Sequence, residues 1–214
     1  TLYAAMRALW HASHDRLATL AFGVLLASGG FLFVQSRIAM LDVFMAAFLM
    51  LALWQLAAAV REPESGRLRL ALAGIALGLS LASKWNVAPL LPLPGLAFLV
   101  ARMAAGRRRL LLSRRGIPVP GVSLLEAALW LGLVPLAVYW ASFVPPALIT
   151  GQALDPAAFL ALHREMFALQ QSVTEAHPYQ SHWWQWALTL RPIWYFYEPV
   201  GGVLRGILLL GNPL

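Results

Sequence analysis

Long apolar blocks separated by short polar segments run along most of this chain. The blocks occupy residues 17–34, 43–60, 68–82, 87–101 and 122–149, and a further block starts at 203–214. About 18 consecutive apolar residues are enough for a helix to cross the hydrocarbon core of a bilayer. Two of the blocks are shorter than this, and prolines interrupt one of them, which membrane helices tolerate when neighbours satisfy the freed carbonyls. The pattern predicts an all-α protein, part of one polytopic transmembrane helical bundle.

Residues 150–199 differ from the rest of the chain because they are polar and rich in aromatic side chains. We expect them to form one long loop. Asp155 followed by Pro156 is a typical helix start, since Asp caps free backbone N–H groups and Pro suits the first turn. A surface helix over 157–171 is therefore expected. The aromatic residues that follow favour a membrane interface; they are Trp183, Trp184, Trp186, Trp194, Tyr195 and Tyr197.

The arginines indicate how the helices are oriented. They precede the first apolar block, separate the second from the third, and separate the fourth from the fifth. All three groups then lie on one side of the membrane, which the positive-inside rule makes the cytoplasmic side. Residues 35–42, 83–86 and 150–199 fall on the opposite side. Any chemistry is therefore expected outside the cytoplasm.

Composition narrows the choice of partners. Charged residues make up 12% of the chain, against about 25% in soluble domains. A net charge of +7 would suggest nucleic acid binding in a soluble protein, but here it comes from arginines in short loops between apolar blocks. We expect the lipid bilayer as a partner and no nucleic acid. The chain has no cysteine, which excludes a disulfide framework and a thiolate metal site.

The ends of the chain suggest an internal fragment of a longer protein. Thr1 is not a start residue, and residues 2–9 resemble the end of a helix. The last apolar block stops short of a full span. No signal peptide is predicted, because the first apolar block has the length of a span and lacks a cleavage site.

Three polar constellations on the extracytoplasmic side are candidates for chemistry. The first, residues 35–42, holds Arg37 and Asp42 between two spans, where charges are costly and usually have a purpose. The two side chains could form an ion pair that closes the turn. Alternatively, Arg37 binds an anionic headgroup, since a guanidinium matches the geometry of a phosphate.

The second constellation is Ser83–Asn86. Its Lys84 is the only lysine of the chain and lies on the side opposite to most arginines. Lys84 could be a helix-end residue that extends its ammonium to the interface, or it could bind a phosphate beside the ring of Trp85. Gly74 and Gly78 have the small-xxx-small spacing that lets membrane helices approach closely, which predicts helix packing rather than a site.

The third constellation is the segment 177–191, which is rich in histidine and tryptophan and contains further polar residues. It could anchor the chain at the interface, or it could form an aromatic platform for a sugar or a peptide, with an arginine for an anion. A metal site has less support, because no acidic or cysteine partner has a useful spacing. The candidate residues are His177, Tyr179, Ser181, Trp184, Trp186 and Arg191.

In this order and on one side of the membrane, the three segments resemble the protein O-mannosyltransferases, a family of C-type glycosyltransferases that use lipid-linked sugars. Residues 36–42 (SRIAMLD) are similar to the family's S-R-x-x-x-L-D segment, and residues 74–85 to its G-x-x-x-G…K-W helix end. Residues 177–192 resemble its H-x-Y-x-S…W-x-W…R-P loop. Three positions depart from the pattern, because Gln170, Trp183 and the segment 86–88 replace a usual His, Pro and Gly.

The resemblance implies an enzyme that transfers mannose from a polyprenyl (dolichyl-type) phosphate to Ser or Thr hydroxyls of secreted or membrane proteins. The family's catalytic acidic pair would lie upstream of Thr1, so no catalytic residue is assigned here. Lys84 and Arg37 would bind the donor phosphate and stabilise its charge. Asp42 would orient Arg37, and Trp85 would support Lys84. The third constellation would form the acceptor or sugar side. The lipid-linked donor is a substrate, and no cofactor is implied.

Other interpretations of the function remain open. A related transferase could act on a lipid or glycan acceptor, and a non-catalytic membrane subunit would share the same features. A transporter or channel would need ionisable residues in mid-span or paired broken helices, whereas the polar residues here lie at the ends of spans. The sequence leaves the oligomeric state open, and a dimer is one of the alternatives. The composition favours the bacterial cytoplasmic (inner) membrane, with the site facing outward.

Overall fold

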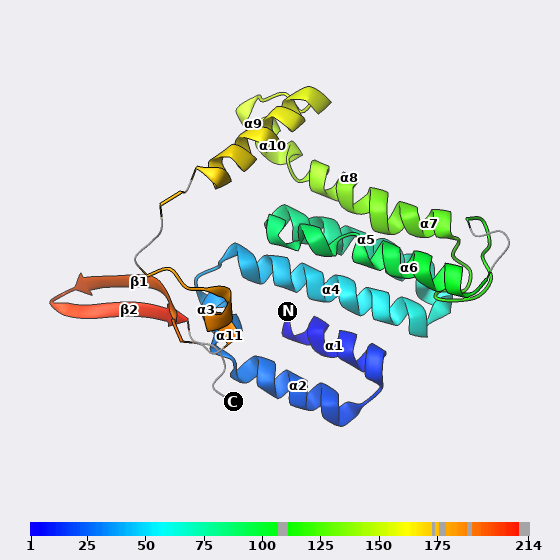
Figure 1. Cartoon of the computed structure of the whole chain (residues 1–214), viewed down its shortest axis with the longest axis horizontal. Coiled ribbons are helices and arrows are strands. Elements are labelled where there is room, and N and C mark those ends of the chain that lie inside the picture. The colour runs from blue at the N-terminus through cyan, green and yellow to red at the C-terminus, as the bar shows by residue number, and fades with distance from the viewer. Residues whose placement is uncertain (107–110, 173, 176–178, 188–189, 210–214) are drawn as a thin grey trace. The chain divides into compact units, whose positions relative to one another are not determined.

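The computed structural model describes residues 1–106, 111–172, 174–175, 179–187 and 190–209. The chain divides into two compact units, Thr1–Tyr139 and the described residues from Trp140 onward. Helices make up the first unit, and helices with a β-hairpin make up the second (Figure 1).

In the first unit, α1 lies between α2 and α4, so the order of the helices in space differs there from their order in sequence. Figure 1 shows α1, α4, α5 and the segment that starts at α7 side by side, with α2 beside α1. The elements are α1 (Leu2–Ser13), α2 (Arg16–Ser28), α3 (Gly30–Arg37), α4 (Leu41–Arg61), η1 (Pro63–Ser65), α5 (Gly66–Ser83), η2 (Trp85–Leu90), α6 (Leu93–Ala104), α7 (Leu124–Ala128), η3 (Leu129–Leu133) and α8 (Val134–Ala141).

The prediction of a helical membrane protein is confirmed. Within the described residues, four helical segments are long and apolar enough to cross a membrane: Leu41–Arg61, Pro63–Ser83, Trp85–Ala104 and Leu124–Thr150. They coincide with four of the predicted blocks. The bent pair α2–α3 makes a fifth if the two helices form one span.

The first predicted block, 17–34, is not one straight helix. Gly29 adopts an extended conformation between α2 and α3, and the two helix axes differ by 53°. Gly29 and Gly30 stand in succession there, and glycine is a weak helix former. The helix also continues beyond the predicted end, so that Arg37 is the last residue of α3.

The span Leu124–Thr150 is irregular around its proline. Pro135 has no N–H to donate to the carbonyl of Leu131, four residues earlier, and its ring crowds that carbonyl. The turn that precedes it, η3, is a π-helix in which the Val134 N–H donates to the Leu129 carbonyl. The helix relieves the conflict at Pro135 with this wider turn.

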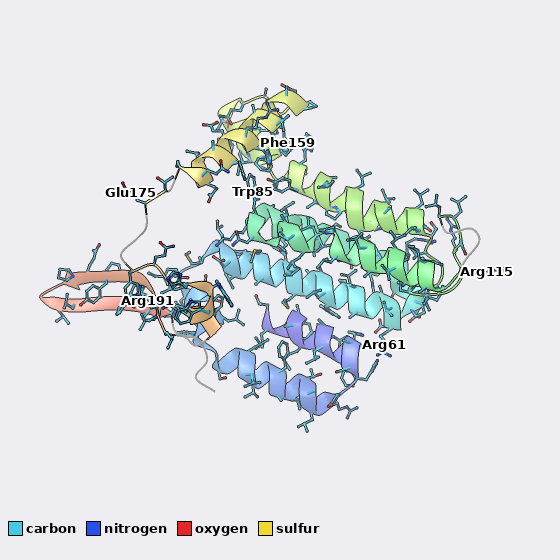
Figure 2. All side chains as sticks on the ribbon, in the orientation of Figure 1. Arg61, Trp85, Arg115, Phe159, Glu175 and Arg191 are labelled. Carbon is cyan, nitrogen blue, oxygen red and sulfur yellow. The ribbon has the colours of Figure 1, made fainter. Side chains whose placement is uncertain are left out.

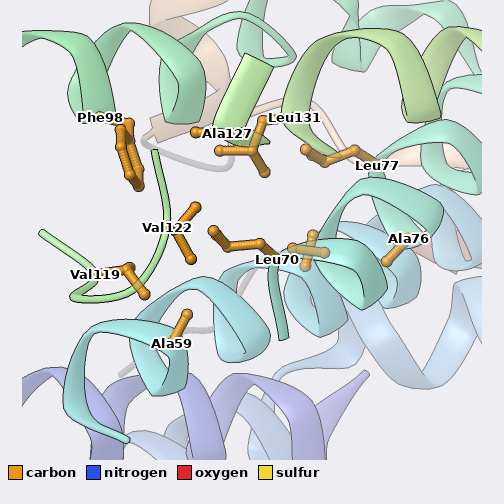
Figure 3. Packing of buried hydrophobic residues seen from close by; sticks show 11 residues of the cluster. Ala59, Leu70, Ala76, Leu77, Phe98, Val119, Val122, Ala127 and Leu131 are labelled. Atoms are coloured by element: carbon orange, nitrogen blue, oxygen red, sulfur yellow. The ribbon is translucent and has the colours of Figure 1, made fainter. Parts of the chain in front are cut away.

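Small residues bring α4 and α5 together in the core of the first unit. Ala52 and Ala59 of α4 and Ala73 and Ala76 of α5 are at most 1% exposed. Larger side chains fill the space around them, from α5 itself, such as Leu70, and from neighbouring segments, such as Val122 and Leu131 (Figure 3). Membrane helices associate through close packing of this kind, because lipid tails are as apolar as the side chains themselves.

Arg61 and Arg115 lie at one end of these helices, and the turn that contains Lys84 (Ser83–Asn86, called the Lys84 turn below) lies at the opposite end. Figure 2 shows Arg61 and Arg115 at one end of the first unit and Trp85 at the other. Arg61 donates from Nε to the carbonyl of His11 and from Nη2 to that of Ala12, both at the end of α1. The arrangement agrees with the two faces that the arginine pattern predicted.

The second unit contains α9 (Val144–Thr150), α10 (Pro156–Gln171), α11 (Trp183–Ala187), β1 (Ile193–Val200) and β2 (Val203–Leu209). The expected helix after Asp155 is confirmed as α10, and the Asp155 carboxylate accepts from the backbone N–H groups of Ala157 and Ala158 at 2.9 and 3.0 Å. Residues 150–199, expected to be one long loop, therefore hold two helices and most of a strand.

One expectation about the second unit is wrong. Residues 203–209 form β2, paired antiparallel with β1, and not the start of a membrane helix. Gly201 and Gly202 both have positive φ, at 61° and 78°, as the two-residue turn of a twisted hairpin requires. The aromatic and β-branched residues that precede them favour a strand. The remaining residues of that block, 210–214, lie outside the described residues.

Candidate functional site

Lys84 and Asp42 form an ion pair that joins the ends of two membrane helices. The Lys84 Nζ lies 2.7 Å from Oδ1 and 2.8 Å from Oδ2 of Asp42. Asp42 stands in the first turn of α4, where the helix dipole favours a carboxylate. Lys84 directly follows α5 in an extended conformation, and its N–H donates to the carbonyl of Ser80. The sequence predicted a different partner for Asp42, namely Arg37.

The ion pair contributes little to the stability of the fold. The side chains of Lys84 and Asp42 are 34% and 24% exposed, and ion pairs with this much access to solvent stabilise a fold by only about 0–1 kcal/mol. An ammonium has three N–H donors, and the carboxylate oxygens of Asp42 engage two of them. Since Asp42 supplies the acceptors that the described residues offer to the Lys84 ammonium, by this count one N–H donor remains for a further anion.

Trp85 ties the same turn to the span Leu124–Thr150. Its Nε1–H donates to the hydroxyl of Tyr139 at 2.7 Å. Ser80, one helical turn before Lys84, is fully buried and donates to the carbonyl of Met45 on α4 at 2.8 Å. These two bonds hold the end of α5 on both of its sides.

Arg37 lies on the other side of the turn that leads into α4. Its guanidinium carbon stands 5.6 Å from the ring centroid of Phe33, one turn earlier on α3. A cavity of about 440 Å³ opens beside it. Apart from Ser36 and Arg37, its described lining is almost wholly apolar: Thr1, Leu2, Leu26, Ala27, Leu32 and Phe33. An apolar hollow with a guanidinium at its edge suits a lipid that carries a phosphate.

The second unit holds a larger cavity of about 950 Å³, which brings together three of the predicted acceptor-side residues. The Arg191 guanidinium carbon lies 5.4 Å from the ring centroid of Tyr179, and its Nη1 donates to the carbonyl of Gln180 at 2.8 Å. Ser181 is the third. The full described lining is Glu175, Tyr179, Gln180, Ser181, Arg191, Pro192, Ile193, Trp194 and Tyr197.

A β-bulge brings two of these aromatic rings to one side of the hairpin. Residues i and i+3 of a regular strand point to opposite faces. The pairing of β1 with β2 shifts between Trp194 and Phe196, and the extra residue of a bulge reverses this alternation. The rings of Trp194 and Tyr197 consequently meet edge to face at 5.1 Å. Gly206 leaves room for the indole, because a Cβ there would lie 2.9 Å from it.

The remaining predicted residues do not line this cavity or cannot be placed. Trp184 stacks on His182, with ring centroids 6.2 Å apart. Trp186 belongs to α11, but its side chain lies outside what the structure describes, as does the whole of His177. Within the described part of the chain, no group of three or more His, Cys, Asp or Glu side chains could hold a metal ion.

Comparison with known families assigns both parts of the chain. Residues 1–149 match the family described as dolichyl-phosphate-mannose-protein mannosyltransferase. The chain belongs to this family. Residues 156–214 match the C-terminal four-transmembrane region of protein O-mannosyltransferases. The family resemblance inferred from the ordered motifs is thus confirmed.

Individual relatives of this mannosyltransferase family member come from two mycobacteria. The polyprenol-phosphate-mannose–protein mannosyltransferase of Mycobacterium tuberculosis (strain H37Rv) is 27% identical over 227 residues, which cover 86% of this chain and 43% of the relative. The protein of the same name from Mycolicibacterium smegmatis (strain mc(2)155) is 27% identical over 256 residues, covering 94% and 48%. The chain therefore spans less than half the length of these relatives. No solved structure gave a significant match.

Sequence reasoning missed several residues around both sites. Tyr139 lies inside an apolar block, and no sequence motif distinguishes it there. Glu175 is an isolated charged residue in a predicted loop. Trp194 and Tyr197 were assigned to the membrane interface, although the two glycines at 201–202 between apolar runs were a hairpin signal that could have shown the strand.

Proposed function

We propose that the full-length protein transfers mannose from a polyprenyl phosphate mannose to Ser or Thr hydroxyls of proteins, on the extracytoplasmic side of the membrane. The observation that carries this proposal is the Lys84–Asp42 pair at the ends of α4 and α5, remote from the arginine-bearing end. Family membership and the names of the mycobacterial relatives support the donor and the protein acceptor.

In the proposed reaction, the acceptor hydroxyl oxygen attacks the anomeric carbon of mannose. The bond between that carbon and the phosphate oxygen breaks, and the lipid phosphate leaves with the electron pair and an added negative charge. The remaining donor of Lys84 would stabilise this charge, since fixed positive groups are most effective where charge develops. The proton passes to a general base, which by family resemblance is a carboxylate upstream of Thr1.

The other parts of the two sites have separate roles in this proposal. Arg37 would bind the lipid phosphate from the side of the 440 Å³ cavity, whose apolar walls would contact the start of the polyprenyl chain. Asp42 holds Lys84 rather than Arg37. The cavity of the second unit, with its aromatic rings and Arg191, would accommodate the acceptor polypeptide or its sugar, as its size allows. His177 and Trp186 keep their predicted acceptor-side role as part of the proposal.

Transfer by the full-length protein, reconstituted in vesicles with polyprenyl phosphate mannose and an acceptor protein, tests the assignment. Lys84→Ala should lower kcat by about 100-fold or more, the scale for losing one charge-stabilising donor. Arg16→Ala removes the same charge at the start of α2 and should leave transfer close to normal. Near-normal transfer by Lys84→Ala would remove the phosphate role from this residue. Transfer to a lipid or glycan but to no protein would indicate the related class of transferase.

The orientation of the site needs its own measurement. Because residues 1–214 contain no cysteine, a single cysteine introduced here can be identified by peptide mapping. Asn86→Cys should react with a membrane-impermeant thiol reagent added outside intact cells, and Glu64→Cys should react only after permeabilisation. The reverse pattern would place the Lys84 turn in the cytoplasm. A bacterial cytoplasmic membrane is the proposed location, in keeping with the relatives.

A further inference from the structure

The glycines of α5 bring it into backbone contact with the span that carries Tyr139. A Cβ at Gly78 would lie 2.6 Å from the carbonyl oxygen of Pro135 and 2.6 Å from the Cβ of Val138. A Cβ at Gly74 would overlap the carbonyl oxygen of Trp130. Side chains at these two positions would therefore force the helices apart. Gly74 and Gly78 thus allow the two helices to pack closely. This close packing also determines the distance between Tyr139 and the end of α5.

The π-helical turn sets the direction in which Tyr139 points. One residue more in a turn rotates everything that follows by about 100° around the helix axis. The Val134 N–H reaches back to Leu129 instead of Trp130, so α8 is rotated relative to α7. On α8, Tyr139 is 8% exposed, and its hydroxyl accepts from the indole N–H of Trp85 at 2.7 Å.

Lys84 depends on its neighbours for a fixed backbone position. It lies between α5 and η2 with φ of −163° and ψ of 134°, outside both helices. On one side its N–H is held by Ser80. On the other side comes Trp85, whose indole reaches across to Tyr139. A residue between two helical segments is free to pivot unless both flanks are anchored, and the Trp85–Tyr139 bond is such an anchor.

We propose that Tyr139 is a positioning residue of the donor site, which acts through Trp85 to hold the Lys84 ammonium where the donor phosphate binds. The inference rests on the phosphate role proposed for Lys84. Tyr139 itself touches neither donor nor acceptor in this proposal. Its hydroxyl limits the motion of the Lys84 turn, and the Lys84–Asp42 pair then keeps one geometry.

Kinetics of the full-length protein separate this role from a merely structural one. Tyr139→Phe keeps the ring and removes the hydrogen-bond acceptor, and we expect the KM for polyprenyl phosphate mannose to rise about three- to ten-fold, the range for losing one buried hydrogen bond. The KM for the acceptor protein should not change. Trp85→Phe should act similarly, and the double variant should be no worse than either single one, because both remove the same bond.

Chemical labelling gives a measurement that does not depend on transfer. Lys84 is the only lysine in residues 1–214, so its acylation rate can be followed by peptide mapping of the full-length protein. Tyr139→Phe and Trp85→Phe should both raise that rate about three- to ten-fold, while Tyr3→Phe, the same substitution on α1, should not.

The outcomes distinguish the positioning role of Tyr139 from the proposed transferase function. Unchanged labelling and unchanged donor KM in Tyr139→Phe would overturn the positioning role. A lower yield of active protein, with both KM values and the labelling rate unchanged, would show a purely structural residue and overturn it too. Faster labelling of Lys84 in a protein that transfers no mannose would uphold the positioning of Lys84 and refute the proposed transferase function.

Discussion

Adding one methyl group at Gly78 should disturb both the packing of α5 and the site at its end. The new Cβ would stand 2.6 Å from the Pro135 oxygen and the Val138 Cβ, whereas ordinary contacts begin at 3.4 Å. The helices must therefore separate by about 0.8 Å, the difference between these two distances. A shift of that size along the Tyr139–Trp85 bond would stretch it from 2.7 Å to about 3.5 Å, the upper limit for such a bond.

The expected cost has two parts. Overpacking of a tight core costs about 1–3 kcal/mol, and the weakened hydrogen bond adds about 1 kcal/mol. Thermal unfolding of the purified full-length protein measures the sum, and acylation of Lys84 reports on the site. Gly95→Ala on α6 is the matched control, since a Cβ there meets nothing within 4 Å; it should keep or slightly raise stability, because Ala favours helix over Gly.

Unfolding of Gly78→Ala at the same temperature as Gly95→Ala, together with labelling of Lys84 at the wild-type rate, would refute this coupling. That result would mean that α5 and α8 can separate without consequence. A loss of stability with unchanged labelling would show that the packing is tight but does not control the Lys84 turn.

Three further predictions concern the two sites and the arginine-bearing end. Asp42→Asn should accelerate acylation of Lys84 and lower kcat/KM for the donor by about tenfold or more, because the ammonium loses its charged partner; equal rates in variant and wild type would contradict the pairing. Trp194→Ala should raise the KM for the acceptor about three- to ten-fold through the lost aromatic surface, with a smaller effect from Trp184→Ala, which lies outside the cavity lining. Arg102→Ala should destabilise the protein by about 3 kcal/mol in denaturation experiments, because the fully buried guanidinium of this α6 residue donates to the carbonyls of residues 115 and 122, whereas Arg115→Ala, at an exposed position after α6, should cost less than about 0.5 kcal/mol.

Most of the correct predictions concern features that depend on residues close to one another in the sequence. Hydropathy alone located the four candidate spans, because a chain segment in lipid must satisfy its backbone polar groups internally, as a helix does. Asp155 and Pro156 predicted the start of α10, since a cap acts on the next few N–H groups. Gly74 and Gly78 predicted a close helix contact, and the ordered motifs predicted the family.

Elements whose secondary structure depends on contacts with another segment were harder to predict from the sequence. The apolar run that begins at Val203 is too short for periodicity to tell strand from helix, and its partner β1 decided the outcome. The bulge that places Trp194 and Tyr197 together exists only in the register of the two strands. The bend at Gly29 likewise has no hydropathy signal, because apolar residues flank it on both sides.

By itself, the sequence determined the four segments that are long and apolar enough to cross a membrane, which end of them bears the arginines, and to which family the chain belongs. Only the tertiary structure decided which groups meet. Asp42 could have paired with Arg37, five positions away, yet it pairs with Lys84 across two helices. Tyr139 reaches Trp85 from a span 54 residues further along the chain. Hydropathy and motifs are one-dimensional, whereas a hydrogen bond or an ion pair depends on distances that close packing of the helices sets.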